Sequence, residues 1–283
     1  MKLLVDSGST KADWIAIDNA GKVLFTTQTL GLNPEVLLKE EIIKRLDDTF
    51  DISHNKDNAT HLFFYGAGCG TDRMKNFLAE VFEKYFSNAV VVVHEDTYAA
   101  VYATTPKNEE AIVCILGTGS NCSYFDGNIL HQKVQSLGYI AMDDCSGNRF
   151  GRHLIRGYYF SKMPAAMAKE LEETYNMDPD FIKNKLYKEP NPNAYLATFA
   201  KFLIKHKDTD FCKKYIYEEL EEFVENYIKQ FDNCTKIPVH FVGSIAFYLK
   251  DELEEVLSKS NIKMGNVLRR PIDGLIAYHI LNK

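Results

Sequence analysis

The sequence predicts an α/β protein with two related domains. Two stretches, which begin at Leu3 and at Ala111, share the order strand, turn of small residues, strand, turn, strand. Each is followed by segments whose apolar residues have the spacing of amphipathic helices. A polar break at 106–109 separates the two copies. We therefore expect one domain at residues 1–106 and a second, with a helical insertion, at residues 107–283.

Composition argues against several classes of function. The 283 residues are 46% hydrophobic, which is ample for packed cores. The formal net charge of −6 argues against a nucleic-acid partner, because proteins that bind nucleic acid usually have a basic face. No apolar run is long enough to cross a bilayer, and the first residues do not form a signal peptide. The six cysteines include no Cys-x-x-Cys pair, so we expect reduced thiols and a cytoplasmic protein.

The elements of the first domain are predicted from apolar periodicity and turn residues. Pro34 predicts a loop, because it keeps Asn33 out of the helical region. The glycine-rich run 66–70 is expected to join a core strand to a helix, since no fitting acid follows it for a dinucleotide site. The expected strands are 3–5, 12–16, 21–25, 61–65 and 89–93, and the expected helices are 35–48, 75–86 and 97–103.

The second domain repeats the three opening strands and then becomes mostly helical, with a proline loop at 190–192. A short apolar run after the helices predicts one more core strand, followed by a helix. The expected strands are 111–116, 121–125, 129–134 and 239–242, and the expected helical segments are 150–231, one around 247–257 and a short one that opens at Asp273.

The first turn of small residues is a candidate phosphate site. It directly follows a buried strand and contains Asp6 and Gly8. Backbone N–H groups in such a turn can hold a phosphate. The carboxylate of Asp6 needs a counter-charge, and a magnesium ion that arrives with a nucleotide would supply it. The alternative is a hairpin whose polar turn has no further role.

Three motifs in order resemble those of the actin, sugar-kinase and Hsp70 superfamily. LLVDSGSTKADW resembles its first phosphate motif, ILGTGSNC its second, and VHFVGSIAFYL its adenosine motif. Within this superfamily the chain resembles the N-acetylglucosamine kinase branch of the BadF/BadG/BcrA/BcrD ATPase-like proteins, least clearly between residues 160 and 236. The resemblance implies two ribonuclease-H-like (actin-like ATPase) domains with a nucleotide and sugar cleft between them.

The resemblance also implies where ATP and its magnesium ion bind. Asp6 matches the acid that positions a hydrated magnesium ion. Gly243 belongs to the adenosine-side turn, where a missing side chain lets the backbone approach the nucleotide. The residues that match contacts to the nucleotide and its phosphates are Asp6, Gly8, Ser9, Thr10, Lys11, Thr118, Gly119, Gly243 and Ser244.

A third set of residues matches the catalytic base and the sugar contacts of the family. Asp96 matches the catalytic base, although a carboxylate before a helix can also be only an N-cap. Asn33 can also be a turn opener, and Asp144 replaces Asp143 if the register slips by one residue. The residues that match sugar contacts are Asn33, Ser120, Asn121 and Asp143.

One stretch departs from the family pattern. Relatives have a Trp-containing approach and then Gly-Asp-Glu-Gly-Ser-Gly, where this chain has residues 137–147. Leu137, Met142, Asp144 and Cys145 stand where Trp, Gly, Glu and Gly are usual. This departure leaves the phosphate motifs intact and leaves the identity of the sugar open.

The function that the resemblance implies is an ATP-dependent kinase for an amino sugar, with N-acetylglucosamine the first candidate. N-acetylmuramic acid and glucosamine are variants of that hypothesis. A rival is an ATPase that activates a 2-hydroxyacyl-CoA dehydratase and holds an iron–sulfur cluster, for which Cys122 and Cys145 would be the ligands. A second rival is an actin-like or chaperone-like nucleotide switch. The expected partner is a small sugar, and a homodimer is one oligomeric state left open.

Overall fold

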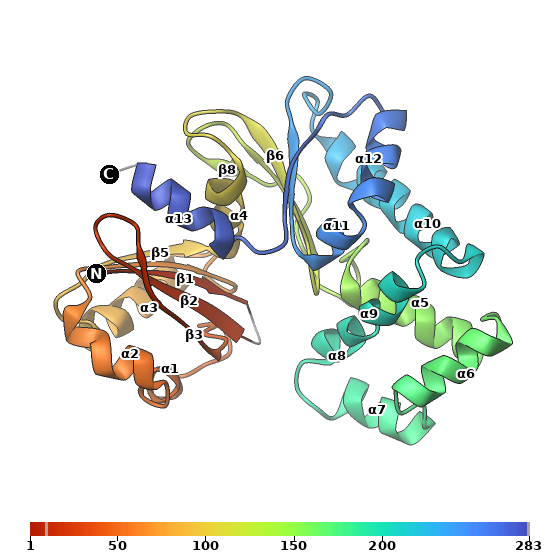
Figure 1. Cartoon of the computed structure of the whole chain (residues 1–283), viewed down its shortest axis with the longest axis horizontal. Coiled ribbons are helices and arrows are strands. Elements are labelled where there is room, and N and C mark those ends of the chain that lie inside the picture. The colour runs from red at the N-terminus through yellow and green to blue at the C-terminus, as the bar shows by residue number, and fades with distance from the viewer. Residues whose placement is uncertain (9–10, 282–283) are drawn as a thin grey trace. The chain divides into compact units, whose positions relative to one another are not determined.

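The computed structural model describes residues 1–8 and 11–281, which form two compact units. Unit 1 comprises Met1–Pro106 and the segment that begins at Arg270, and unit 2 comprises Lys107–Arg269 (Figure 1). The chain therefore returns to unit 1 after completing unit 2. The predicted second domain, 107–283, is too long at its end, because Ile272 and Leu275 are buried in the core of unit 1.

Unit 1 is built on a five-stranded mixed sheet in the order β3-β2-β1-β4-β5. The first three strands form the predicted antiparallel meander, and β4 and β5 run parallel to β1. The third strand is longer than the predicted 21–25. The strands are β1 (Lys2–Ser7), β2 (Lys11–Ile17), β3 (Val23–Leu30), β4 (His61–Gly66) and β5 (Val90–Glu95).

Helices cover both faces of this sheet, because successive residues of β1 point to opposite sides. Leu3 and Val5 pack against α1 (Lys39–Asp47), α2 (Phe50–Asn55) and α3 (Asp72–Tyr85). On the other face, Leu4 packs against α4 (Asp96–Thr104) and α13 (Ile272–Leu281). A 3-10 turn at Lys56–Asn58 follows α2. The predicted helix 35–48 begins only at Lys39, because a turn held by the carbonyl of Asn33 occupies its expected first residues.

Unit 2 has a second five-stranded sheet, in the order β10-β9-β6-β7-β8. Read in chain order, this topology is the same as in unit 1, so the predicted repeat of strands is confirmed. The predicted strand 129–134 is reduced to two residues, and the last strand was not predicted because Gly265 and Asn266 interrupt its apolar pattern. The strands are β6 (Ala111–Leu116), β7 (Ser120–Phe125), β8 (Leu130–His131), β9 (Val239–Val242) and β10 (Met264–Leu268).

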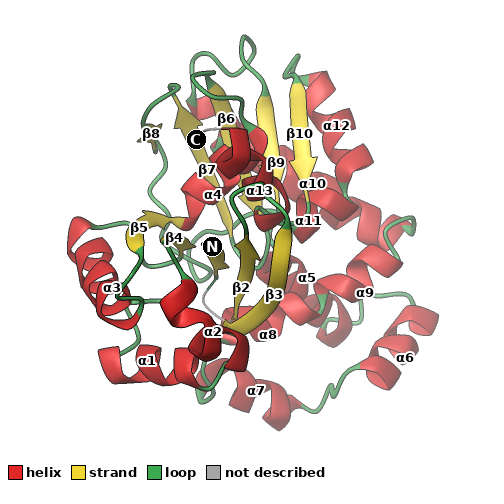
Figure 2. Ribbon diagram, turned by 60° about the vertical axis from the view of Figure 1, so that its left-hand side comes forward, coloured by secondary structure: helices red, strands yellow, loops and turns green. Residues whose placement is uncertain are grey.

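The helices of unit 2, drawn in red in Figure 2, pack on one large apolar core. The side chains of Cys114, Phe150, Leu220 and Phe241 are buried together in this core. The predicted helix around 247–257 is two helices, separated at Leu249. The helices are α5 (Gly147–Tyr159), α6 (Ala165–Thr174), α7 (Pro179–Tyr187), α8 (Pro192–Thr198), α9 (Ala200–Lys205), α10 (Asp210–Asn226), the 3-10 turn Ile228–Gln230, α11 (Ser244–Tyr248) and α12 (Lys250–Lys259).

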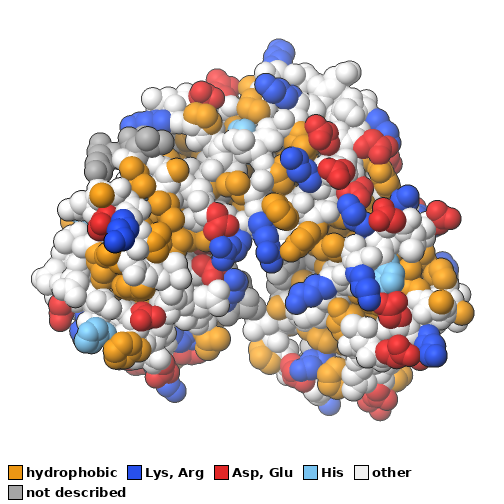
Figure 3. All heavy atoms as spheres, in the orientation of Figure 1, with side chains coloured by type: hydrophobic (Ala, Val, Ile, Leu, Met, Phe, Trp, Pro, Cys, Tyr) orange, Lys and Arg blue, Asp and Glu red, His pale blue; other side chains and the backbone are white. Residues whose placement is uncertain are grey.

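On the face drawn in Figure 3, basic and acidic side chains are interspersed. In the part of the chain that the structure describes, no helix combines the length and the apolar character that crossing a bilayer requires.

Candidate functional site

In unit 1, carboxylates gather on the sheet face that α4 and α13 cover. Asp6 lies on the same face of β1 as Leu4, because the two residues are two positions apart. Asp13 is paired with Asp6 across the antiparallel β1–β2 ladder and therefore points to the same face. Asp96 is the first residue of α4, and its charge raises the pKa of Asp6. Asp6, Asp13 and Asp96 form what we call the carboxylate group of unit 1.

The carboxylate group is only partly neutralised. Lys11 forms an ion pair of 2.9 Å with Asp13, which also accepts a hydrogen bond of 2.6 Å from Gln28. Arg270 lowers the pKa of Asp6 but is itself paired with Asp273 at 2.7 Å. Burial, followed by the charges of Asp96 and Asp13, raises the pKa of Asp6 to about 7. A surplus of negative charge of this kind fits a hydrated divalent cation.

Asp96 is not an N-cap, contrary to the alternative weighed from the sequence. The N-cap of α4 is Glu95, which makes no side-chain cap hydrogen bond. Burial and then the charge of Glu95 raise the pKa of Asp96 to about 6, while the backbone N–H of Thr97 lowers it. A carboxylate with this pKa is ionised at neutral pH and can still accept a proton, as general-base catalysis requires.

Asn33 opens a turn, as its position before Pro34 predicts. Its Oδ1 accepts a hydrogen bond of 2.9 Å from the backbone N–H of Glu35. The Asn33 side chain also packs on Gly68, where an added Cβ would lie 2.0 Å from Oδ1. Gly68 has a φ of +82°, which disfavours any residue with a side chain. The glycine run 66–70 is therefore a connecting turn, and it supports the Asn33 side chain.

Ser7 joins both of these loops to β1, and sequence reasoning did not identify it. Its Oγ accepts a hydrogen bond of 3.0 Å from the N–H of Leu32, and its carbonyl accepts one of 2.8 Å from the N–H of Ala67. Ser7 is 1% exposed and belongs to the same face of β1 as Leu3 and Val5. A hydroxyl at an inward-facing position of a buried strand was the available signal. Gly8 follows Ser7, and Ser9 and Thr10 lie outside the described residues.

In unit 2, the turn Gly117–Gly119 turns its carbonyl groups inward. The first N–H groups of α5 donate to it, from Gly147 to Gly117 O at 2.8 Å and from Asn148 to Thr118 O at 3.0 Å. Gly117 N–H donates to Gly119 O at 3.0 Å. Among the described residues, the N–H groups of Thr118 and Gly119 have no acceptor. The turn therefore offers two backbone donors to an anion.

Asp143 lies against this turn. It is 7% exposed, and its φ of +65° is strained for a residue with a side chain. One carboxylate oxygen accepts a hydrogen bond of 3.4 Å from the N–H of Ser120, and the other accepts a hydrogen bond of 3.0 Å from Nδ2 of Asn148. An added Cβ on Gly119 would lie 2.7 Å from Asp143 Oδ2. The glycine at 119 is therefore required by the close approach of this carboxylate.

Gly243 is required by a contact inside unit 2. Its φ is +122°, and an added Cβ would lie 2.2 Å from Leu116 O and 3.2 Å from Gly117 N. The sequence reading explained this glycine by the approach of a nucleotide, whereas the structure shows the backbone against the end of β6. Ser244 follows as the exposed first residue of α11.

Ser120 and Asn121 do not point to one side of the sheet. They are consecutive residues of β7, so their side chains project to opposite faces. The Oγ atom of Ser120 is buried without a hydrogen-bond partner among the described residues. Oδ1 of Asn121 accepts a hydrogen bond of 3.1 Å from Ser123. The structure thus brings Ser120, but not Asn121, to Asp143.

In the stretch that departs from the family pattern, the backbone at residue 145 has a conformation that favours the glycine found in relatives. Cys145 has a φ of +57°, the left-handed region that glycine adopts without strain. Its N–H donates a hydrogen bond of 2.9 Å to the carboxylate of Glu219. The same carboxylate accepts a hydrogen bond of 2.7 Å from Nε of Arg149 and another from His153. Glu219 is 2% exposed and holds this loop from α10.

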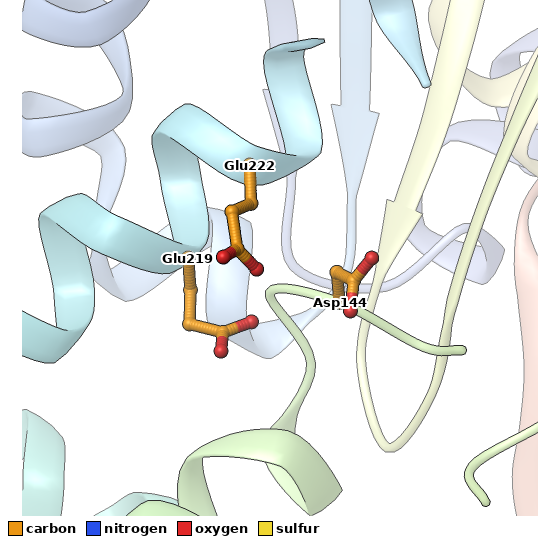
Figure 4. A group of neighbouring side chains, drawn as sticks. All are labelled: Asp144, Glu219 and Glu222. Atoms are coloured by element: carbon orange, nitrogen blue, oxygen red, sulfur yellow. The ribbon is translucent and has the colours of Figure 1, made fainter. Parts of the chain in front are cut away.

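Glu219 also belongs to a group of three acids with Asp144 and Glu222 (Figure 4). One carboxylate oxygen from each lies within 4.8 Å of the others. Arg149 contacts all three, at 2.7 Å from Glu219, 3.7 Å from Glu222 and 3.9 Å from Asp144. The guanidinium therefore compensates one of the three possible negative charges, and burial raises the pKa of Asp144.

The cysteines proposed as cluster ligands are part of the core of unit 2. Cys122 and Cys145 are 3% and 0% exposed, and Cys122 Sγ lies 3.4 Å from Cys114 Sγ. Burial raises the pKa of the Cys145 thiol well above its usual value. Thiols packed in this way are not presented to a second subunit, which disfavours an iron–sulfur cluster shared between subunits.

Comparisons with solved structures agree with this topology. A proposed N-acetylglucosamine kinase from Porphyromonas gingivalis is 32% identical, with a TM-score of 0.93 over 100% of this chain and 99% of that one. A second one, from Chromobacterium violaceum, is 14% identical, with a TM-score of 0.69 over 98% of each chain. A ROK family glucokinase from Streptomyces griseus, in complex with glucose and AMPPNP, is 15% identical, with a TM-score of 0.60 over 99% and 98%.

The last two likenesses concern the fold alone, whereas the first, at 32% identity, confirms the predicted pair of actin-like ATPase domains. No curated protein matches the sequence. The model of the BadF/BadG/BcrA/BcrD ATPase family matches residues 5–276, which is nearly the whole chain. The match includes the second and third motifs and all but the first two residues of the first motif. This chain belongs to the BadF/BadG/BcrA/BcrD ATPase family.

Proposed function

We propose that the protein is an ATP-dependent kinase that phosphorylates a hydroxyl group of an amino sugar, with N-acetylglucosamine the first candidate. The observation that carries this proposal is the position of Asp96, a half-buried carboxylate at the carboxyl end of β5 whose pKa is raised to about 6. The 32% identical protein from Porphyromonas gingivalis, described as a proposed N-acetylglucosamine kinase, supports the choice of sugar.

In this proposal Asp96 accepts the proton of the sugar hydroxyl as the hydroxyl oxygen attacks the γ-phosphorus of ATP. The bond from the γ-phosphorus to the bridging oxygen breaks, and ADP leaves. The N–H groups of Thr118 and Gly119 bind the phosphates, as do the first turn from Gly8 to Lys11 and, on the adenosine side, Gly243 and Ser244. Asp6 would hold a hydrated magnesium ion, which neutralises phosphate charge when bound. Positioning and electrostatics of this kind account for most catalysis in phosphoryl transfer.

The proposed sugar contacts are Asn33 in unit 1 and Ser120, Asn121 and Asp143 in unit 2. The buried Oγ of Ser120 supports this assignment, because a buried hydroxyl without a partner is costly unless a ligand satisfies it. A site that hydrogen-bonds an acetamido sugar rejects analogues that leave its polar groups unpaired. The altered loop at 142–145 keeps N-acetylmuramic acid and glucosamine among the candidates. A cytoplasmic location and a homodimer complete the proposal.

A coupled assay of ADP release tests the function. N-acetylglucosamine, N-acetylmannosamine, N-acetylmuramic acid, glucosamine and glucose are compared at fixed MgATP. We expect N-acetylglucosamine or a close relative to have the highest kcat/KM. Glucose equal to or better than every amino sugar would refute the amino-sugar assignment. The absence of sugar-dependent ADP release with all five sugars, together with a visible-light absorption band of an iron–sulfur cluster, would favour the dehydratase-activator alternative.

A further inference from the structure

Asn148, the second residue of α5, joins the two parts of the unit 2 site. The side chain is 0% exposed. Its Nδ2 donates a hydrogen bond of 2.7 Å to Thr118 O and a hydrogen bond of 3.0 Å to Asp143 Oδ2. Because both of these neighbours are acceptors, the atom between them must be the amide nitrogen. Its own backbone N–H donates to Thr118 O as well.

The same amide group therefore holds the turn that would bind phosphates and the acid that would bind the sugar. The two are also in direct contact, since Gly119 leaves no room for a Cβ beside Asp143 Oδ2. Closely packed groups of this kind cannot move independently. A ligand that shifts Thr118 must shift the carboxylate of Asp143 through Asn148.

The other end of the amide is unsatisfied. Oδ1 of Asn148 is buried and accepts no hydrogen bond from the described residues. A helix start does not need this side chain, because Ser146 is the N-cap of α5 and its Oγ accepts from the N–H of Arg149 at 3.4 Å. Alanine is also the better helix former. A role in folding alone therefore does not explain an asparagine at this position.

We propose that Asn148 is a positioning residue that couples nucleotide binding at Thr118 to sugar binding at Asp143. This inference rests on the proposed kinase function. Occupation of the phosphate turn then favours the orientation of Asp143 that binds the sugar, and by linkage the sugar raises the affinity for the nucleotide by the same factor.

Equilibrium calorimetry of the full chain tests the coupling. The affinity for N-acetylglucosamine is measured with and without saturating Mg–AMPPNP, in the parent and in Asn148→Ala. We expect AMPPNP to tighten sugar binding by about tenfold in the parent, within the usual range for coupled sites. In Asn148→Ala the coupling should disappear.

Asn55→Ala is the control in unit 1, because Asn55 likewise donates an amide hydrogen bond to a backbone carbonyl, that of Asp51 in α2, at 2.9 Å. It should keep the parental coupling. Asn148→Asp is the second variant: it keeps the size of the side chain, loses the donor and places a negative charge beside Asp143. It should lose the coupling and bind the sugar more weakly.

Two results would overturn the inference while leaving the kinase proposal standing. These are the absence of coupling in a parent that binds both ligands, and parental coupling in Asn148→Ala or Asn148→Asp. Loss of folding in both variants, seen as loss of the cooperative thermal transition, would assign Asn148 a structural role and also overturn it. A parent that binds neither ligand would refute the proposed function and this inference with it.

Discussion

Asp6 and Asp13 stand directly opposite each other on the antiparallel strands β1 and β2. Like charges in this arrangement are destabilising, and these two are also turned toward the covered face of the sheet. Asp13 has partners in Lys11 and Gln28, whereas the pKa of Asp6 is raised to about 7. The fold therefore keeps a carboxylate that lowers its stability, which is typical of a residue retained for function.

Asp6→Asn should stabilise the protein above pH 7 and weaken its magnesium-dependent turnover. The folded pKa of about 7 lies above the ordinary value of 3.8, so the folded state binds the proton more tightly and loses stability as pH rises between these values. The variant removes that loss. Thermal unfolding at pH 4 and pH 8 should show a higher Tm than the parent only at pH 8.

Asp18→Asn is the control with the opposite sign. Backbone hydrogen bonds, first that of Lys22, lower the pKa of this exposed carboxyl. Its contribution to stability is present above its ordinary pKa, so the control variant should have a slightly lower Tm at pH 8. A parental magnesium dependence in Asp6→Asn would show that Asp6 has no role near the metal ion.

Asp96→Asn should remove the catalytic base and leave the fold intact. An amide cannot accept the hydroxyl proton, so kcat should fall by at least about 10²-fold. Because Glu95, and not Asp96, is the N-cap, and because the pKa of Asp96 is raised, the Tm at pH 8 should be no lower than that of the parent. The affinity for ATP should be nearly unchanged.

The parent should lose kcat/KM as pH falls through about 6, where Asp96 becomes protonated. An Asp96→Asn enzyme with retained turnover per folded molecule would move the base elsewhere, and Asp143 would be the first candidate.

Ser7→Ala should raise the KM for the sugar more than the KM for ATP. The variant leaves the buried N–H of Leu32 without its acceptor, which costs about 1–3 kcal/mol. The loop that carries Asn33 then loses its attachment to β1. Denaturant unfolding and steady-state kinetics measure the two effects. Ser53→Ala, which removes only a donor to the carbonyls of Thr49 and Phe50 at the start of α2, should change neither KM. Equal sugar KM values in Ser7→Ala and the parent would exclude the positioning role.

Gly119→Ala should disrupt the turn of unit 2, whereas Gly117→Ala should be tolerated in folding. A Cβ at 119 would lie 2.7 Å from Asp143 Oδ2, while one at 117 meets nothing within 4 Å. We expect a Tm close to the parental value for Gly117→Ala and a lower Tm with weaker sugar binding for Gly119→Ala. Similar Tm values for the two variants would show that Asp143 can move away from the turn without cost.

Local patterns in the sequence predicted most of the fold, because β1 and its counterpart β6 contain clear apolar runs that are followed by turns of small residues. Contacts between distant segments were not predictable in this way. The sequence near Asp273 does not indicate that Gly274 packs against Ala103. A Cβ added at Gly274 would lie 2.6 Å from Ala103 O. The role of Asn148 was not predicted for the same reason, because its hydrogen-bond partners are 5 and 30 residues away in the sequence.

The return of the chain at Arg270 has a consequence for biosynthesis. Residues 107–269 of unit 2 are continuous in sequence, so this unit can fold as soon as it has left the ribosome. The α4 face of unit 1 stays uncovered until Ile272 and Leu275 are made. The nascent chain must therefore carry the apolar side chains of Leu4 and Ile15 in an unfinished core while about 160 residues are added. A chain stopped at Arg269 should expose this surface and bind a hydrophobic dye more strongly than the full chain.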